Sequence, residues 1–247
     1  MKKASAKRAK PARSAIGLAL IALAMVSVLV SLGIWQLHRK DEKRALIAAL
    51  TERLAAAPVA LPPKSQWQNL SPANDEFTRV TFEATLDSKS DAKVYSSGSA
   101  LRTDISGLGT FVFAPARLKD GSVVAVDRGF VPDGASADPI PPQVYKLTGY
   151  IRFAEKSGWF TPHEDASKRL WFARDHLAMA RANGWGEVAP FYIDLESQVP
   201  PSGLPKSGPL QVHLKDDHLQ YAITWFGLAL AVSATFGFWI FSQRGKR

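Results

Sequence analysis

Histidine is the candidate ligand for haem iron in this sequence, whose 247 residues contain five His and no Cys. The lack of thiols excludes a thiolate metal site, a redox-active Cys pair and a Cys nucleophile. No two histidines have the i,i+4 spacing that would place both on one helix face, and the three Met form no cluster that would favour Cu(I). A single neutral imidazole can still act alone, as an axial ligand of haem iron.

His218 has the most informative position. It follows Asp216 and Asp217 and stands three residues before Tyr221, where a long uncharged run begins. Two interpretations stay open: a polar residue that ends a soluble domain and caps the next helix, or an axial haem ligand at the membrane surface, where a haem macrocycle partitions. For the other histidines we expect a surface loop at His163, an exposed or half-buried helix position at His176 and a strand at His213.

No local pattern of a familiar enzyme class occurs. The sequence lacks GxSxG, Walker A and HExxH motifs. Gly107-Leu108-Gly109 is a lone GxG with Val112 where a dinucleotide fingerprint needs Gly, so we expect a loop before a strand there. A Ser, His and Asp site assembled from distant segments leaves no local pattern, and a membrane-tethered periplasmic hydrolase therefore remains an alternative.

The positive charge is confined to two short tails. Residues 1–13 carry six Lys or Arg and residues 242–247 carry three, with no acid in either segment. Residues 38–217 hold 22 basic and 22 acidic residues and are neutral overall. A nucleic-acid-binding protein needs its basic surface on the folded domain, so the sequence argues against a nucleic-acid partner.

Two uncharged runs of 21 residues, Ala15–Trp35 and Tyr221–Phe241, flank the neutral region. At 1.5 Å per residue each reaches about 30 Å, the thickness of a bilayer core, which predicts transmembrane helices over residues 15–37 and 219–241. The first run is longer than a signal-peptide core and lacks a small-x-small site after it, which favours an uncleaved anchor. Neither run holds Asp, Glu, Lys, Arg or His, which favours a tether over a transporter.

Basic residues favour the cytoplasmic side of a membrane, and long connecting domains cross it largely regardless of their charge. We therefore expect cytoplasmic tails at residues 1–14 and 242–247, and an extracytoplasmic domain over residues 38–218 in a bacterial periplasm. The absence of a long Arg- and Ser-rich presequence favours a bacterial plasma (inner) membrane over a mitochondrial one.

Periodicity predicts the elements between the spans. A helix over Arg39–Ala57 should continue the first span until Pro58 ends it. Strands are expected at residues 79–86, 92–95, 109–118, 122–131, 144–153, 191–195 and 210–214, a helix at 174–182, an irregular loop at 132–142 and a linker at 200–209. The predicted fold class is α+β: a two-span membrane protein with a mainly antiparallel β extracytoplasmic domain that carries a few helices.

Six segments together resemble the surfeit locus protein 1 family of cytochrome c oxidase assembly factors. They are LGIWQLHRK (residues 32–40), VAVDRGFVP (124–132), LTGYIRFAEK (147–156), WFARDHLAMA (171–180), FYID (191–194) and DDHLQYAITWFGLA (216–229). Their order between two apolar runs makes the resemblance specific. The sequence departs from the family at Asp127 and Asp216, where Asn is usual, and at residues 107–115, where a Pro-Gly-Tyr element is replaced.

The resemblance implies a non-enzymatic assembly factor for haem-copper cytochrome c oxidase. Its cofactor would be transiently bound haem A, to be inserted into or stabilised in subunit I, and its partners would be that subunit, other oxidase assembly factors and the bilayer. No structural metal is expected. The resemblance makes His218 the candidate axial ligand, with Trp35, Gln36, Arg128, Gly129, Tyr221 and Trp225 as supporting family positions. A scaffold that binds no haem and stabilises an oxidase intermediate is the alternative within the same family.

Overall fold

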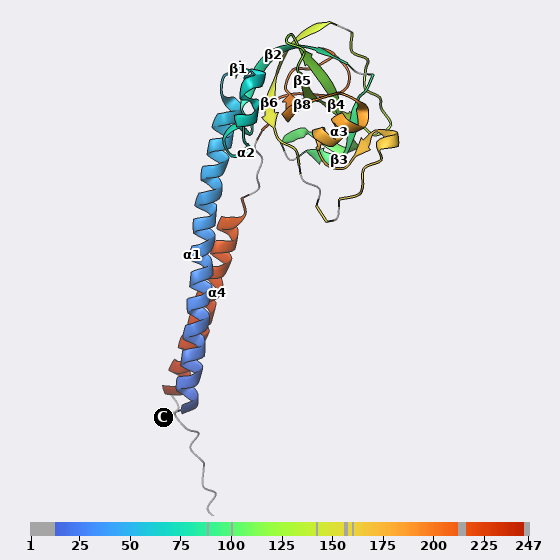
Figure 1. The fold of residues 1–247 in the computed structure, drawn as a ribbon. Coiled ribbons are helices and arrows are strands. Elements are labelled where there is room, and N and C mark those ends of the chain that lie inside the picture. Colours follow the sequence, from blue (N-terminus) through green and yellow to red (C-terminus); the bar gives the residue numbers. More distant parts are fainter. Residues whose placement is uncertain are drawn as a thin grey trace, which may run out of the picture. The chain divides into compact units, whose positions relative to one another are not determined.

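The computed structural model describes residues 13–87, 89–99, 101–141, 143–155, 158–159, 161–211 and 216–244 (Figure 1). The chain forms two compact units, Met1–Leu46 with Lys215–Arg247, and Ile47–Leu214. The predicted tails at 1–14 and 242–247 and His213 lie wholly or largely outside the described residues.

Two long helices make up the first unit, except for the residues of α1 after Leu46, which are assigned to the second unit. Helix α1 covers Arg13–Ala55 and helix α4 covers His218–Arg244. The predicted continuation of the first apolar run into a helix over residues 39–57 is confirmed, because α1 runs unbroken to Ala55. The most apolar 18-residue windows of the two helices have mean hydropathies of 2.5 and 1.7, yet only 6% of each window is buried. A core helix of a soluble protein would be mostly buried; these two helices are long and apolar enough to cross a membrane.

The two helices of this unit approach closely where α1 carries a glycine. A Cβ on Gly33 would lie only 2.6 Å from the ring of Phe226 on α4, so a larger side chain there would push the helices apart. Ala222 and Ala229 of α4 are buried as well. Small residues allow such close helix contact in membranes.

The second unit is built on a β-sheet. Its strands are β1 (Val59–Ala60), β2 (Arg79–Leu86), β3 (Ala92–Ser99), β4 (Arg102–Leu118), β5 (Val123–Pro132), β6 (Val144–Arg152), β7 (Leu170–Trp171) and β8 (Val188–Leu195). Short helices accompany them: α2 (Pro72–Asp75), α3 (His176–Asn183) and the 3-10 turns η1 (Lys64–Asn69) and η2 (Ala166–Lys168).

The sheet closes on itself. The order of the described strands is β1-β2-β6-β8-β5-β4-β3-β7, and β2 also pairs with β4. The pairings β2–β6–β8–β5–β4–β2 therefore form a closed five-stranded barrel, with β3 continuing outward from β4 (Figure 1). Most described pairings are antiparallel, as predicted, but β1–β2, β3–β7 and β5–β8 are parallel.

Strand β5 is the most deeply buried strand of the barrel. All of its residues from Val123 to Val131 are buried, whereas β2 alternates between buried and more exposed positions along its length. The difference arises because β5 packs on both faces, with Val124 and Val126 in one apolar cluster and Ala125 and Phe130 in the other, whereas the buried residues of β2 belong to one cluster alone. Two apolar clusters fill the two sides, one around Leu147, Phe191 and Ile193 and the other around Phe113 and Met179.

Several predicted elements agree with the structure, and some do not. The hairpin of β4 and β5 turns at Asp120 and Gly121, as expected from the sequence. Gly107-Leu108-Gly109 lies inside β4 rather than in a loop before a strand. The late strand predicted at 210–214 is absent at Leu210 and Gln211, the two of its residues that the structure describes.

The segment predicted as a linker at 200–209 packs on the barrel instead. Lys206 exchanges backbone hydrogen bonds with Phe130 of β5. The side-chain amide of Gln198 donates to the carbonyl of Pro205, 2.6 Å away. Arg102 donates to the carbonyls of Ser207 and Gly208. Its prolines and glycines make this segment irregular in shape, but its hydrogen bonds fix it in place.

Candidate functional site

His218 opens α4 and is held by a residue of α1. Its Nδ1 lies 2.8 Å from Oε1 of Gln36. Because an amide oxygen can only accept, Nδ1 donates in this contact, and in the neutral form of the ring this leaves the lone pair on Nε2. Nε2 is the nitrogen that could bind a metal. Metal-binding histidines commonly donate their other ring N–H to an oxygen that fixes the ring's orientation and raises its basicity, and Gln36 occupies that place here.

The start of α4 is fixed by a second set of contacts. The backbone N–H of His218 donates to Oδ1 of Asp216, 3.3 Å away. The guanidinium of Arg44 on α1 lies 3.4 Å from the other oxygen of Asp216. The first backbone N–H of α4 is thus bonded to Asp216. The imidazole is left for its contact with Gln36 and stays half-buried.

Aromatic side chains surround this part of the helix pair. Tyr221 and Trp225 stand three and seven residues after His218, so the three share one face of α4. Trp35 directly precedes Gln36. Trp35 and Tyr221 are 53% and 55% exposed, and Trp225 is half-exposed. These side chains are exposed apolar surface within two helical turns of His218 or next to Gln36 in sequence.

The donor set fits haem better than a bare ion. Within the described residues, no group of three or more His, Asp or Glu is arranged to hold a metal ion. Haem iron already has four ligands from its macrocycle and needs only an axial one, such as a histidine. The structure shows one oriented imidazole, together with exposed aromatic rings on the same two helices.

Arg128 lies in the other unit, in the middle of β5, with no exposed surface. Its Nη1 donates to Oδ2 of Asp91, 2.8 Å away, and its Nη2 donates to the backbone carbonyl of Asp138 at 3.0 Å and to that of Val199 at 3.5 Å. The buried guanidinium is therefore paired with a carboxylate. Burial raises the pKa of Asp91 to about 7, although the positive charge of Arg128 opposes this shift. Arg128 joins three separate segments and acts as a structural residue.

Gly129 is required by the backbone that surrounds it. Its φ is +117°, a value that L side chains rarely adopt. A Cβ there would lie 2.5 Å from the carbonyl carbon of Lys206 and 2.7 Å from the backbone nitrogen of Ser207. Gly129 thus permits the irregular segment after β8 to pack against β5. Like Arg128, it supports the barrel.

The seven predicted site residues fall into two groups. The structure brings His218 and Gln36 into contact within the first unit, and the same unit carries Trp35, Tyr221 and Trp225. Arg128 and Gly129 belong to the second unit.

Sequence reasoning missed a buried ionic cluster in the barrel. Asp127 of β5 and Asp194 of β8 are paired directly across the parallel strands. Arg174 Nε lies 3.6 Å from Oδ2 of Asp127, and Arg152 Nη1 lies 3.7 Å from Oδ2 of Asp194. Burial raises the pKa of both carboxyls, and the charge of Asp194 raises that of Asp127 further. The sequence signal was an acid inside each of two apolar strand patterns, VAVDRGF and FYIDL.

The remaining histidines also differ in their surroundings. His163 is exposed in a loop, as expected. His176 is fully buried, so the prediction of an exposed or half-buried position was wrong. Its Nε2 lies 3.1 Å from the carbonyl oxygen of Ala189, and its ring packs on Tyr192. Burial lowers the pKa of His176 to about 4, so the ring is neutral at pH 7 and has a structural role.

These features define a class: a closed β-barrel domain carried between two exposed apolar helices, with an oriented histidine at the start of the second. Comparison with known proteins narrows the class. The model of the SURF1 family matches residues 23–230. A SURF1-like protein of Monosiga brevicollis is 31% identical over 238 residues, which cover 90% of this chain and 86% of that protein. Surfeit locus protein 1 of Rattus norvegicus and of Homo sapiens are each 31% identical, covering 82% of this chain and 69% and 70% of their own lengths. The chain belongs to the SURF1 family.

Proposed function

We propose that this protein is a membrane-anchored assembly factor for a haem-copper cytochrome c oxidase, and that it holds haem A through His218. Membership of the SURF1 family implies a role in cytochrome c oxidase assembly. The protein would act without catalysing a reaction. Its partners would be oxidase subunit I and other assembly factors.

Membrane insertion is supported by the two apolar helices and their exposure. Each is long enough to span a bilayer core of about 30 Å, and each has only 6% of its most apolar window buried. The two basic tails favour cytoplasmic termini. The barrel domain would then lie on the periplasmic side of a bacterial inner membrane, and His218 would lie near the outer surface of that membrane.

The hydrogen bond between His218 and Gln36 carries the haem proposal. A histidine that only ended the soluble domain would need no partner from a helix 182 residues away in sequence. The contact selects the tautomer with a proton on Nδ1 and keeps Nε2 available. Trp35, Tyr221 and Trp225 would cover the apolar macrocycle. When bound, haem A supplies the redox chemistry of the oxidase, while this protein supplies only its placement.

The test is an absorption spectrum of the full chain purified from cells that make haem A. We expect bound haem in the wild type, and in His218→Ala a much weaker signal with shifted bands at an unchanged protein level. His163→Ala, in an exposed loop, is the control and should keep the wild-type spectrum. An unchanged spectrum of His218→Ala would reject this ligand. A wild type without haem, co-purifying with an oxidase intermediate, would favour the haem-free scaffold.

A further inference from the structure

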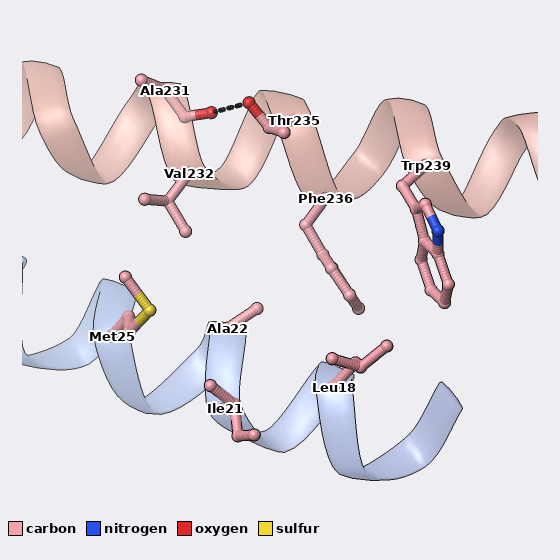
Figure 2. A pocket seen from close by; sticks show the side chains of 9 residues that line it. All are labelled: Leu18, Ile21, Ala22, Met25, Ala231, Val232, Thr235, Phe236 and Trp239. Carbon is pink, nitrogen blue, oxygen red and sulfur yellow. Dashed lines mark hydrogen bonds between the residues drawn. The ribbon is translucent and has the colours of Figure 1, made fainter. Parts of the chain in front are cut away.

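The apolar groove between the two long helices does not identify an occupant. It has a volume of about 500 Å³ and lies between the start of α1 and the end of α4 (Figure 2). The hydroxyl of Thr235 in its lining already donates to the backbone carbonyl of Ala231 at 2.8 Å. Buried polar atoms without partners are found instead in the barrel domain, around Asp127 of β5.

Two buried carboxyl groups are neighbours in the barrel. Asp127 and Asp194 of β8 are direct partners in the parallel pairing of their strands. Asp127 has no exposed surface, and Asp194 is 8% exposed. Two carboxylates that share a buried site repel each other, and this repulsion disfavours the ionisation of both. Whether both can be ionised therefore depends on the cations around them.

Asp127 is poorly neutralised. Its ion-pair partner among the described residues is Arg174, whose Nε lies 3.6 Å from Oδ2. The same guanidinium also lies 3.3 Å from Glu155 and rests over the ring of Phe111 at 4.3 Å. The other oxygen of Asp127, Oδ1, accepts a 2.9 Å hydrogen bond from the backbone N–H of Gly129. One cation thus serves two acids.

Asp194 has no cation to itself either. Arg152 lies 3.7 Å from its Oδ2 but is hydrogen-bonded to Glu76 at 2.6 Å. The charge of Arg102 also acts on Asp194, yet this guanidinium makes two 2.7 Å hydrogen bonds to Asp104. Each of these cations is held by another acid, so the carboxyl pair keeps an excess of negative charge unless a proton is bound.

The hydrogen bonds of this cluster point to the same conclusion. Oδ2 of Asp127, Nε of Arg174 and the hydroxyl of Tyr192 are buried and have no hydrogen-bond partner among the described residues. Tyr192 stands two positions before Asp194 on β8, so both side chains lie on one face of the strand, and the ring of His176 packs on it. An ionised carboxylate can only accept, whereas a protonated carboxyl can also donate. Because a buried acceptor without a donor is costly, a proton on Oδ2 is favoured.

We propose that the folded barrel binds one proton on Oδ2 of Asp127 at neutral pH, and that this proton stabilises the pairing of β5 with β8. Loss of the proton would leave two negative charges on neighbouring strands of the closed barrel. The site lies within the barrel domain, so the proposal is independent of haem and of membrane insertion.

The direction of the pH dependence follows from the burial of Asp127. Burial and the charge of Asp194 raise the pKa of Asp127 above its ordinary value, which is about 3.9 in an unfolded chain. The folded chain therefore holds this proton more tightly than the unfolded chain does. The stabilisation is full below about pH 4 and is lost as the pH rises through the folded pKa.

The test compares the full chain, purified without haem, with Asp127→Asn, whose amide is uncharged at every pH and keeps an oxygen for Gly129. Unfolding by denaturant is measured between about pH 5 and pH 9. Because one proton is involved, the unfolding equilibrium constant of the wild type should rise relative to that of Asp127→Asn by about ten-fold per pH unit until the proton has left. Asp133→Asn makes the same change at an exposed position after β5 and should follow the wild type.

Infrared spectroscopy of the same samples detects the proton itself. At about pH 6 ordinary exposed carboxyl groups are ionised. The spectrum of the wild type minus that of Asp127→Asn should then contain the C=O band of a carboxylic acid, and the difference from Asp133→Asn should not. A carboxylate band in its place would overturn the proposal, and so would a ratio of the two unfolding constants that does not change with pH. An Asp127→Asn chain that cannot fold would show that the barrel needs the negative charge, which would overturn it as well.

Discussion

Nδ1 of His218 lies 2.8 Å from Oε1 of Gln36, so a residue at the start of one apolar helix is oriented by a residue of the other. His218 provides a free Nε2 atom, and the hydrogen bond from Nδ1 to Gln36 fixes the tautomer of the His218 ring. If His218 binds haem, Gln36 must influence that binding without touching the iron.

Gln36→Leu should therefore weaken haem binding although the ligand remains. Loss of a residue that orients a metal-binding histidine typically lowers affinity about ten-fold or more. Gln36→Glu keeps an acceptor oxygen and should bind nearly as the wild type does. Gln220→Leu makes the same change at an exposed position of α4 and serves as the control. Haem titration of the purified variants measures the effect, and equal affinity of Gln36→Leu and wild type would contradict this role.

Arg128→Ala should destabilise the barrel strongly, because it leaves the Asp91 carboxylate and two loop carbonyls without their donor. Breaking a buried pair of this kind costs about 3–5 kcal/mol, which corresponds to a fall of about 10 °C in melting temperature for a domain of this size. Thermal unfolding of the full chain, followed by tryptophan fluorescence, measures the change. Arg117→Ala, on the more exposed end of β4, should change the melting temperature little; a similar shift for both variants would argue against a special role of Arg128.

Gly129→Ala should cost more than a glycine replacement at another position with positive φ. Gly107 has φ +86° and open space around it, so Gly107→Ala pays only backbone strain, about 1–3 kcal/mol. Gly129→Ala introduces the same kind of backbone strain, and its Cβ also collides with the backbone at Lys206. The difference in free energy of unfolding between the two variants isolates the collision. Equal stability of the two variants would mean that the backbone at Lys206 shifts away from the new Cβ at little energetic cost, and would contradict this prediction.

Acidification should weaken the barrel through His176. Its folded pKa, lowered to about 4 by burial, lies below the unfolded value of about 6.5. The unfolded chain therefore binds the proton first, and this stabilising contribution, full above about pH 6.5, is lost as the pH falls towards 4. Between pH 7 and pH 5 the loss is about 2 kcal/mol.

Comparison with His176→Gln isolates this contribution, since glutamine does not titrate. Denaturant unfolding at pH 7 and pH 5 should show the wild type losing more stability than His176→Gln. His163→Ala, whose histidine is exposed, should follow the wild type at both pH values. A wild type and His176→Gln that lose stability in parallel would mean that the imidazole takes up its proton without unfolding.

The proposed topology predicts the behaviour of reporter fusions. A reporter active only in the periplasm should work when inserted at Ala135, in an exposed loop of the barrel domain. The same reporter fused after Arg247 should be inactive, because that tail would stay in the cytoplasm. Activity at the C-terminus would reject the two-span arrangement.

Local patterns were sufficient where neighbouring residues decide the structure. Strand β2 was predicted with its observed limits because its apolar residues alternate, and the hairpin of β4 and β5 because Asp120 and Gly121 mark its turn. The parallel pairing of β5 with β8 could not be predicted, since no periodicity states which distant strand a buried strand will join. Barrel closure through β2 and β4 was missed for the same reason.

In the candidate site, too, local features could be predicted from the sequence and contacts between distant residues could not. His218 stood out by its position between acids and an apolar run, and the family resemblance added Gln36. Their mutual contact joins residues 182 positions apart, and no local spacing encodes it. His176 was misjudged because Asp175 before it suggested a solvent-exposed helix start. The Asp175 side chain instead caps that helix at Ala178, and the imidazole turns inward.

The three partners of Arg128 also bear on the order in which the barrel can form. Asp91, Asp138 and Val199 are 37, 10 and 71 residues away from it in sequence. Contacts over such separations require long loops to close first, and chains rich in them fold slowly. The guanidinium can leave water at little cost only once all three segments have arrived, so its burial belongs to the last steps of folding. Until then, we expect the apolar residues of β5 to be within reach of chaperones and proteases.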